Sequence, residues 1–405
     1  MFSRVFLAVF VALPACAEAP PAPDWVPTVL TAQEAEEGFY PLFNGKDLDG
    51  WRFRGPNKQA FEAKDGLLVV NGADDGDWLF TEAEYENFVL RFEYRLPRGG
   101  ANSGVGIRAT KEGDPAFTGM EIQVVTPTEE PSWNTAGALY STVAPAVAAD
   151  NPVGVWNFVE VTCDGDRIRT LMNGRKLYDI LITDYAEPGE GELEWRKPLT
   201  GRARSGHIAV QNHGDSLVYR NIRIKPLPGG EGFRPLFNGR NLDGWTPMGD
   251  AKWFVRNGTM TFDPSEMTER SGLRTDEAFG DFELRLSFRP EEQANSGVFF
   301  RGSGDDPWPR SYEVQIDNHS PDQWTGAIWD QVPASELRAM DGCWSHMRIV
   351  ARGPMIQVAV NGKVVVDYFS TRHEEHPSGW ICLQAHDPGS VVAFRDIEIK
   401  ELSAE

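Results

Sequence analysis

Hydrophobic and polar residues alternate along this chain in short runs, with the spacing of strands rather than helices. The runs are rich in β-branched and aromatic residues and end at Gly, Asn, Asp or Pro, which is typical of β-strands. Many short strands with frequent turns favour a β-sandwich. The sequence therefore predicts an all-β protein. The clearest runs are residues 67–70, 88–94, 159–163 and 208–211 in the first half, and 282–288, 312–316 and 356–360 in the second.

Local signals between these runs predict two hairpins and one short helix. Asn173-Gly174 and Asn361-Gly362 each separate two strand-like runs, and Asn-Gly is the strongest short signal for a tight β-turn. Thr31-Ala-Gln-Glu34 has the form of a capping box, and Gly38 can end the helix that it starts. We therefore expect a helix over residues 31–37.

Three motifs occur twice, in the same order. Phe-x-Pro-Leu-Phe-Asn-Gly-x-x-Leu-Asp-Gly-Trp, Ala-Asn-Ser-Gly-Val and Gln-x-His begin at residues 39, 101 and 211, and again at residues 233, 294 and 384. The period is far longer than that of a solenoid repeat, so the chain is expected to contain two complete domains.

The expected domains are residues 31–227 and 232–403, joined through the Pro- and Gly-rich segment 226–232. Each is long enough to bury a core of its own. The first domain has an extra loop at residues 185–204, rich in Glu, Gly and Arg. Such a loop is either functional or a surface decoration.

The N-terminus predicts export. Residues 1–17 contain Arg4 and then an apolar run that is too short to span a bilayer, as in a signal peptide. Leu13-Pro-Ala-Cys16 resembles a lipoprotein cleavage box, so Cys16 is either lipidated or removed by simple cleavage nearby. Residues 18–30 would form a stiff Pro-rich linker. The expected location is the periplasm, with or without an outer-membrane lipid anchor.

Charge and cysteine content exclude some classes of partner and fold. The 405 residues include 39 basic and 60 acidic ones, a net charge of −21. This charge argues against nucleic acid or an anionic membrane as a partner. The four cysteines are too few for a disulfide framework.

Alternation also predicts which side chains leave the core. In the run 312–317, Tyr312, Val314 and Ile316 would pack inward, while the other face shows the polar set Glu313, Gln315 and Asp317. Gln384 and His386 share a face in their strand, and Trp344 and His346 share one in theirs. Carboxylate, amide, imidazole and indole groups suit a carbohydrate cleft. The alternative is an ordinary solvated sheet face.

The first half repeats part of this set, with Glu121, Gln123, Gln211, His213 and Arg108. It has Val125 and Phe158 where the second half has Asp317 and His346, so the second half is the stronger candidate for chemistry.

The spacing of the acidic and histidine residues along the chain predicts neither a conventional glycosidase carboxylate pair nor a metal site. Four strand residues separate the Cα atoms of Glu313 and Asp317 by ~13 Å, whereas glycosidase carboxyl groups lie roughly 5–10 Å apart. The histidines show no tight ligand spacing. We expect no metal cofactor, although the Asp-rich turns at 74–77 and 304–306 could hold Ca²⁺.

With these residues in view, the chain resembles the 3-keto-disaccharide hydrolase domain family. The resemblance rests on the repeated motifs, on Tyr-Glu-Val-Gln-Ile at 312–316, on Thr-Gly-Ala-Ile at 325–328 and on a closing Phe-Arg-x-Ile-x-Ile-Lys. It covers nearly everything from Gly38 to Leu402, twice over. It implies concanavalin A-like jelly-roll sandwiches, an exported bacterial protein and action on glycosides whose C3 hydroxyl is oxidised to a ketone.

The resemblance also implies a chemistry. A ketone at C3 acidifies the C2 hydrogen, so a base can remove it while an acid helps the C1 substituent leave, and water then adds back. The hypothesis is that Glu313 and His386 are the acid and base, Arg301 and Gln315 bind the enolate or hydroxyls, and Trp344 stacks on the sugar. The other expected substrate-binding residues are Asp317, His346, Gln384 and Asn295 in the second domain and Arg108, Glu121, Gln123, Gln211 and His213 in the first.

Two rival functions stay open at this point. The same sandwich can serve as a non-catalytic glycan-binding module, because fold does not fix function. A cell-surface assembly protein would need no affinity for sugar at all.

Overall fold

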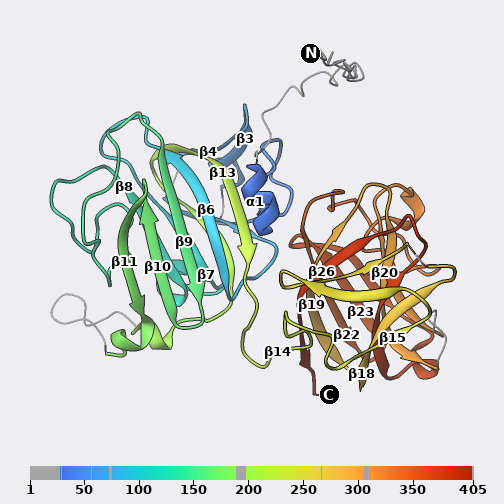
Figure 1. Ribbon diagram of the computed structural model, residues 1–405. Coiled ribbons are helices and arrows are strands. Elements are labelled where there is room, and N and C mark those ends of the chain that lie inside the picture. Colours follow the sequence, from blue (N-terminus) through green and yellow to red (C-terminus); the bar gives the residue numbers. More distant parts are fainter. Residues whose placement is uncertain are drawn as a thin grey trace, which may run out of the picture.

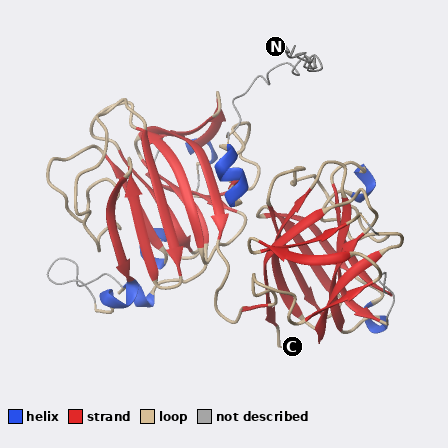
Figure 2. Ribbon diagram, viewed as in Figure 1, coloured by secondary structure: helices blue, strands red, loops and turns tan. Residues whose placement is uncertain are grey.

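The chain forms two β-sandwiches in sequence order, as a computed structural model describes it (Figure 1). Strands dominate both halves, and the described helices are short (Figure 2). The predicted all-β class and the pair of tandem jelly-roll sandwiches are confirmed. The described residues are 28, 30–55, 57–72, 75–187, 198–265, 267–304 and 310–403.

Several predictions fall outside this described part. They are the signal peptide, Cys16, most of the Pro-rich linker, the middle of the extra loop in the first domain and parts of both Asp-rich turns. Within the described part, no helix is both long enough and apolar enough to cross a membrane.

In the first sandwich, the described strands form an eight-stranded and a five-stranded antiparallel sheet. The larger sheet has the order β11-β10-β9-β6-β13-β4-β3, with β1 also paired to β13, and the smaller has the order β2-β5-β12-β7-β8. The bounds are β1 Tyr40–Pro41, β2 Trp51–Arg54, β3 Phe61–Lys64, β4 Leu67–Asn71, β5 Asp75–Thr81, β6 Phe88–Arg95, β7 Asn102–Ala109, β8 Met120–Val125, β9 Asn157–Asp164, β10 Arg167–Met172, β11 Arg175–Leu181, β12 His207–His213 and β13 Ser216–Pro226.

The second sandwich repeats both sheets in the described residues. The larger has the order β16-β17-β26-β19-β22-β23-β24, with β14 paired to β26, and the smaller has the order β15-β18-β25-β20-β21. The bounds are β14 Arg234–Pro235, β15 Trp245–Met248, β16 Lys252–Arg256, β17 Thr259–Asp263, β18 Ser271–Phe279, β19 Phe282–Pro290, β20 Asn295–Ser303, β21 Arg310–Asp317, β22 Ser345–Arg352, β23 Met355–Val360, β24 Lys363–Phe369, β25 Gly379–Ala385 and β26 Val392–Glu401.

The alternating pattern explains how the core forms between the sheets. In β6, the side chains of Phe88, Leu90, Phe92 and Tyr94 are buried, while the residues between them are only partly covered. Both Asn-Gly hairpins form as predicted: Met172 pairs with Arg175 in the first domain, and the matching turn joins β23 to β24 in the second. Each sandwich therefore buries one apolar layer between its two sheets.

The predicted helix is α1 (Ala32–Glu37), and its capping box forms between Thr31 and Glu34. The Glu34 carboxylate also accepts hydrogen bonds from Arg91 and Arg223, which fix the helix on the outer face of the eight-stranded sheet. Burial raises the pKa of Glu34, but the Thr31 backbone N–H and the two arginines outweigh it and lower the pKa to about 2. The second short helix is α2 (Pro115–Thr118).

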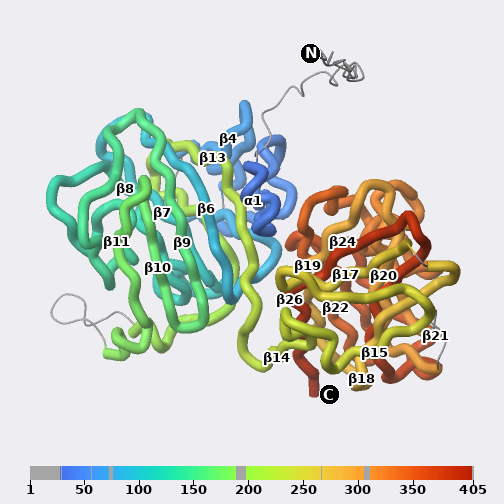
Figure 3. Tube along the Cα trace, in the orientation of Figure 1, coloured from blue at the N-terminus to red at the C-terminus, as the bar shows by residue number. Residues whose placement is uncertain are grey.

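The outer face of the second domain's eight-stranded sheet lies against the first domain, with α1 between the two sandwiches (Figure 3). Lys363 forms ion pairs with Asp49 (2.7 Å) and Glu82 (3.3 Å) of the first domain. Arg395 donates to the backbone oxygen of Glu37, at the end of α1, over 2.8 Å. This packing leaves the outer face of the five-stranded sheet, on the opposite side of the second sandwich, for the site described next.

Candidate active site

A polar cluster lies on the outer face of the second domain's five-stranded sheet. Gln384 on β25 donates from Nε2 to Oε1 of Glu313 on β21, over 2.9 Å. Gln315, two residues further along β21, donates from Nε2 to Oδ1 of Asn295 over 3.0 Å. Only 7% of Glu313 is exposed, and both glutamines are buried. The structure therefore brings four predicted site residues together, and their face is not an ordinary solvated one.

The Asn-Ser-Gly motif has a steric role beside this cluster. A Cβ atom on Gly297 of β20 would lie 2.2 Å from Oε1 of Glu313, so the carboxyl group occupies space that another residue would fill. In the first domain, a Cβ atom on Gly104 would lie 1.7 Å from Oε1 of Glu121. The glycine of each repeat therefore leaves room for the buried carboxyl group on the neighbouring strand.

Burial sets the protonation state of Glu313. It raises the pKa of this carboxyl to about 8, against the opposing effects of the Gln384 hydrogen bond and the positive charge of Arg270. Most molecules therefore carry a protonated Glu313 at neutral pH. A buried carboxylic acid that still titrates near neutrality is suited to giving and taking a proton.

His386 follows the end of β25, and 29% of its side chain is exposed. Its Nδ1 lies 2.7 Å from Oδ2 of Asp387, and Ser390 donates to the same carboxylate oxygen over 2.9 Å. Burial raises the pKa of Asp387, but the hydrogen bonds from His386, Gly389 and Ser390 outweigh it and lower that pKa. Asp387 thus orients the imidazole, a role that the sequence analysis missed.

The expected role of Arg301 must be corrected. Its backbone has a positive φ of 54° at a bulge in β20, and the side chain is fully buried instead of facing the cluster. Its guanidinium group donates to the backbone oxygens of Gly280 (3.0 Å) and Gly353 (2.8 Å) and to Asp281 (2.8 Å). Since Gly353 lies between strands of the other sheet, Arg301 ties the two sheets together.

Arg108 takes the same position in the first domain and needs the same correction. Its φ is 51°, and it donates to the backbone oxygens of Glu86 and Gly165. We therefore assign both arginines a structural role.

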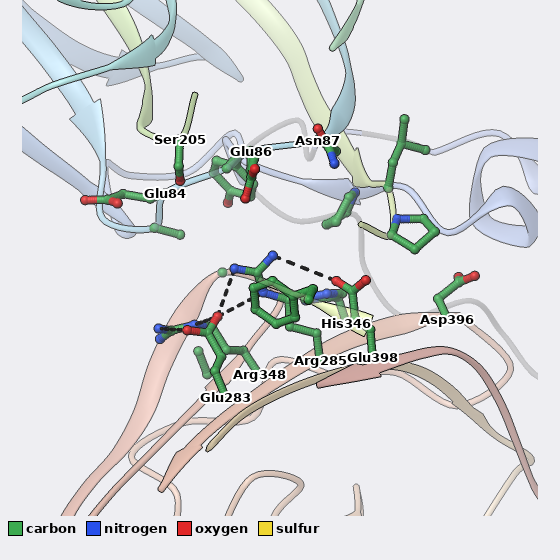
Figure 4. Close-up of a pocket in the computed structure, with 18 of the residues that line it drawn as sticks. Glu84, Glu86, Asn87, Ser205, Glu283, Arg285, His346, Arg348, Asp396 and Glu398 are labelled. Atoms are coloured by element: carbon green, nitrogen blue, oxygen red, sulfur yellow. Dashed lines mark hydrogen bonds and ion pairs between the residues drawn. The ribbon is translucent and has the colours of Figure 1, made fainter. Parts of the chain in front are cut away.

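Trp344 and His346 also lie away from the cluster. His346 belongs to the eight-stranded sheet on the other side of the sandwich, where it pairs with Ser287, and Trp344 directly precedes the same strand, β22. The Trp344 ring packs 3.9 Å from the Arg395 guanidinium group, and His346 lines a cavity between the domains (Figure 4). Trp344 therefore cannot stack on a sugar bound at Glu313.

Asp317 completes the list for the second domain. Its Oδ1 accepts the backbone N–H groups of His319 (2.7 Å) and Ser320 (3.2 Å), so its carboxylate stabilises the turn after β21.

An exposed tryptophan that the sequence analysis did not select lies directly beside Glu313. The backbone N–H of Trp329 donates to the backbone oxygen of Glu313 over 2.9 Å, next to a bridge between Ile328 and Val314. Opposite residues of an antiparallel pair point to the same face, so Trp329 shares the outer face with Glu313. It is 48% exposed. The indole is therefore the aromatic surface available to a sugar here.

The internal sequence repeat contains a motif that could have identified Trp329. Gly-Ala-Leu-Tyr at residues 137–140 matches Gly-Ala-Ile-Trp at residues 326–329. Tyr140 donates its backbone N–H to the oxygen of Glu121 over 2.8 Å, as Trp329 does to Glu313. An aromatic residue thus borders the buried carboxyl group in both domains.

The cluster in the first domain is similar but less connected. Glu121 is only 2% exposed, and no described residue donates a hydrogen bond to its carboxyl group. Burial, with a contribution from Asp114, raises its pKa well above the usual value. Gln123 donates to Asn134, while Oε1 of Gln211, like that of Gln384 in the second domain, is buried with no hydrogen-bond partner among the described residues. His213 ends β12, at the exposed edge of this face.

The contacts described above do not test the expectation that the protein has no metal cofactor. In the part of the chain that the structure describes, no three His, Cys, Asp or Glu side chains are grouped so as to hold a metal ion.

Comparison with known proteins identifies the family. The sequence matches the 3-keto-alpha-glucoside-1,2-lyase-like domain over residues 38–225 and again over residues 232–400. The chain therefore belongs to this family and carries two copies of its domain, which places it among carbohydrate-active proteins.

Individual relatives cover about one copy each. A 3-keto-disaccharide hydrolase of Bacteroides thetaiotaomicron is 27% identical over 47% of this chain and 79% of its own length. A Parabacteroides distasonis crystal structure, named as a candidate glycosyl hydrolase, is 28% identical with a TM-score of 0.41, over 49% of this chain and 99% of that one. The carbohydrate-binding module CBM66 of Bacillus subtilis is 16% identical with a TM-score of 0.32, over 39% of this chain and 96% of that one.

Proposed function

We propose that this protein cleaves glycosides whose C3 hydroxyl has been oxidised to a ketone, and that the second domain carries out the reaction. The single observation that supports this proposal most is the buried Glu313, with its raised pKa, beside the donor Gln384 and the exposed Trp329. Family membership and the named hydrolase activity of the Bacteroides relative support the substrate class.

The proposed reaction balances with water as the only co-reactant. A base takes the C2 hydrogen as a proton, the C2–H electrons form a double bond to C1, and the C1–O bond breaks as an acid protonates the leaving oxygen. Water then adds its hydroxyl to C1 and a proton to C2. Glu313 in its protonated form is the proposed acid, and His386, oriented by Asp387, is the proposed base. Trp329 is the proposed stacking surface for the sugar ring.

The test is release of sugar from 3-keto disaccharides by the purified full-length protein, with unoxidised disaccharides as controls. Glu313→Gln and His386→Ala should each reduce turnover by about 10²–10⁴-fold, while binding measured by calorimetry changes little. The matched variant Asp317→Asn alters a turn-forming carboxylate and should retain activity. Sugar binding without turnover in the wild type would instead identify a glycan-binding module. Export, directed by residues 1–17, is a further part of the proposal.

A further inference from the structure

A cavity of about 650 Å³ lies between the two domains, which is in the range of pockets that hold small ligands. Its floor is the outer face of the second domain's eight-stranded sheet, and its roof is formed by residues 82–87 of the first domain (Figure 4). Residues 226–228 of the linker also line it. Glu313 projects from the opposite sheet of the second sandwich, so this cavity is separate from the candidate active site.

Fixed charge pairs form part of the floor. Glu283 accepts hydrogen bonds from Nε (2.7 Å) and Nη2 (3.0 Å) of Arg348, and Arg285 approaches the same carboxylate at 2.9 Å. Glu398 lies 3.8 Å from Arg285 and accepts the backbone N–H of Gly229 in the linker. The charged groups of the floor are therefore paired with one another, and one of its carboxyl groups accepts a hydrogen bond from the segment that joins the domains.

The floor also offers hydrogen-bonding capacity beyond these contacts. The His346 side chain lines the cavity and hydrogen-bonds to no described residue. Burial and the charges of Arg285 and Arg348 lower its pKa to about 3, so the ring is neutral and has one donor and one acceptor nitrogen. Burial and nearby negative charge raise the pKa of Glu398 to about 7, so this carboxyl can donate as well as accept.

The signs of the lining charges select the ligand class. Glu84, Glu86 and Arg204 line the cavity from the first domain, and Arg285, Arg348, Lys400 and several carboxyl groups line it from the second. An anion would meet carboxylates on both sides, and a cation would meet the basic side chains on both sides. A hydroxyl group both donates and accepts, so it fits a wall on which carboxyl, guanidinium and imidazole groups alternate.

We propose that the interdomain cavity binds a neutral sugar of one or two rings, held between the two domains. This site is distinct from the proposed reaction site, and binding there requires no oxidised substrate. It gives the tandem arrangement a purpose, because the walls come from both copies.

The experiment titrates sucrose, trehalose, lactose and maltose into the full-length protein by calorimetry at neutral pH. At least one should bind with a Kd of about 1 mM or tighter. His346→Ala should weaken this binding by about tenfold, and Ser287→Trp, which places a large side chain on the cavity floor, should abolish it. Ser287→Ala, at the same position, should still bind. The bound sugar should also slow proteolysis of the linker at residues 227–233.

Glu313→Gln separates this proposal from the reaction mechanism. It should remove turnover and leave interdomain binding unchanged, whereas Ser287→Trp should do the reverse. The proposal is overturned if none of the four sugars binds, or if the folded Ser287→Trp variant binds as tightly as the wild type. The proposal is also overturned if Glu313→Gln loses binding of the sugar while Ser287→Trp keeps it, because the sugar would then occupy the candidate active site.

Discussion

The two domains bury the same carboxyl group but surround it differently. In the first domain Gln211 lies opposite Trp78 on the neighbouring strand, whereas in the second Gln384 lies opposite Gly272. On the other side, Glu121 pairs with Gly106, whereas Glu313 pairs with Phe299. The bulky aromatic residue and the glycine have thus changed places around the carboxyl group.

This exchange keeps the packing and changes the electrostatics. The Trp78 ring reaches to within 3.4 Å of where a Gly106 Cβ atom would lie, so it fills space beside Glu121 that Phe299 fills beside Glu313. With no large residue opposite it, Gln384 can reach Glu313 and partly stabilise the ionised form. Within the described part of the chain, no side chain donates to the Glu121 carboxyl group in this way. The comparison teaches that burial raises the pKa of the carboxyl group in both repeats, and that only in the second repeat does a described side chain oppose this effect with a hydrogen bond.

The largest expected effect comes from the glycines beneath the two carboxyl groups. Gly297→Ala puts a Cβ atom 2.2 Å from Oε1 of Glu313 and should push the carboxyl group out of place, with at least about a 100-fold loss of turnover. Gly104→Ala causes the matching clash with Glu121 in the first domain and should leave turnover nearly unchanged. The measurement is kcat on a 3-keto disaccharide.

Gly99→Ala is the neutral control, because its Cβ atom would meet nothing within 4 Å. Equal losses in Gly297→Ala and Gly104→Ala would show that both domains contribute to turnover, which would break the comparison.

The next effect concerns stability and pH. The pKa of Glu313 is higher in the folded protein, at about 8, than its ordinary value of 4.5, so its contribution to stability is full below about pH 4.5 and is lost as the pH rises toward 8. Glu313→Gln removes this titration. Between pH 5 and 8 the free energy of unfolding should therefore fall less in the variant than in the wild type, by on the order of 3 kcal/mol.

Urea unfolding at the two pH values measures this difference. Glu121→Gln should also reduce the fall, because burial raises the pKa of Glu121 well above its usual value. A fall as steep in either variant as in the wild type would contradict the raised pKa of the carboxyl group that the variant removes.

The sequence could predict the cluster wherever alternation alone decides the geometry. Gln315 and Glu313 share a face because they are two residues apart, and the Gln-x-His repeat places Gln384 on the matching face of a second strand. The prediction for Arg301 was wrong because a residue with positive φ at a bulge no longer follows the alternation of the strand. Its side chain therefore turns inward.

The predictions for Trp344 and His346 as substrate-binding residues beside Glu313 were wrong for a different reason. Alternation tells which side of a strand a residue occupies, but not which of two sheets the strand joins, and that depends on pairings distant in sequence. The hydrogen bond from Gln384 that affects the pKa of Glu313 requires a small residue, Gly272, opposite Gln384. The role of Gly272 can be recognised only when the pairing of these two strands is known.

The smallest expected effect tests that register directly. Gln384→Leu removes the donor to Glu313 and should make the second site resemble the first. A hydrogen bond to an ionised group is worth about 1.5 kcal/mol, so losing it should raise the pKa of Glu313 by about one unit above 8. The pH–rate profile of kcat should show the limb assigned to Glu313 moving to higher pH by that amount. The equivalent change in the first domain, Gln211→Leu, removes no bond to Glu121 and should leave the profile in place. A shift in both variants, or in neither, would mean that Gln384 does not set the protonation of Glu313.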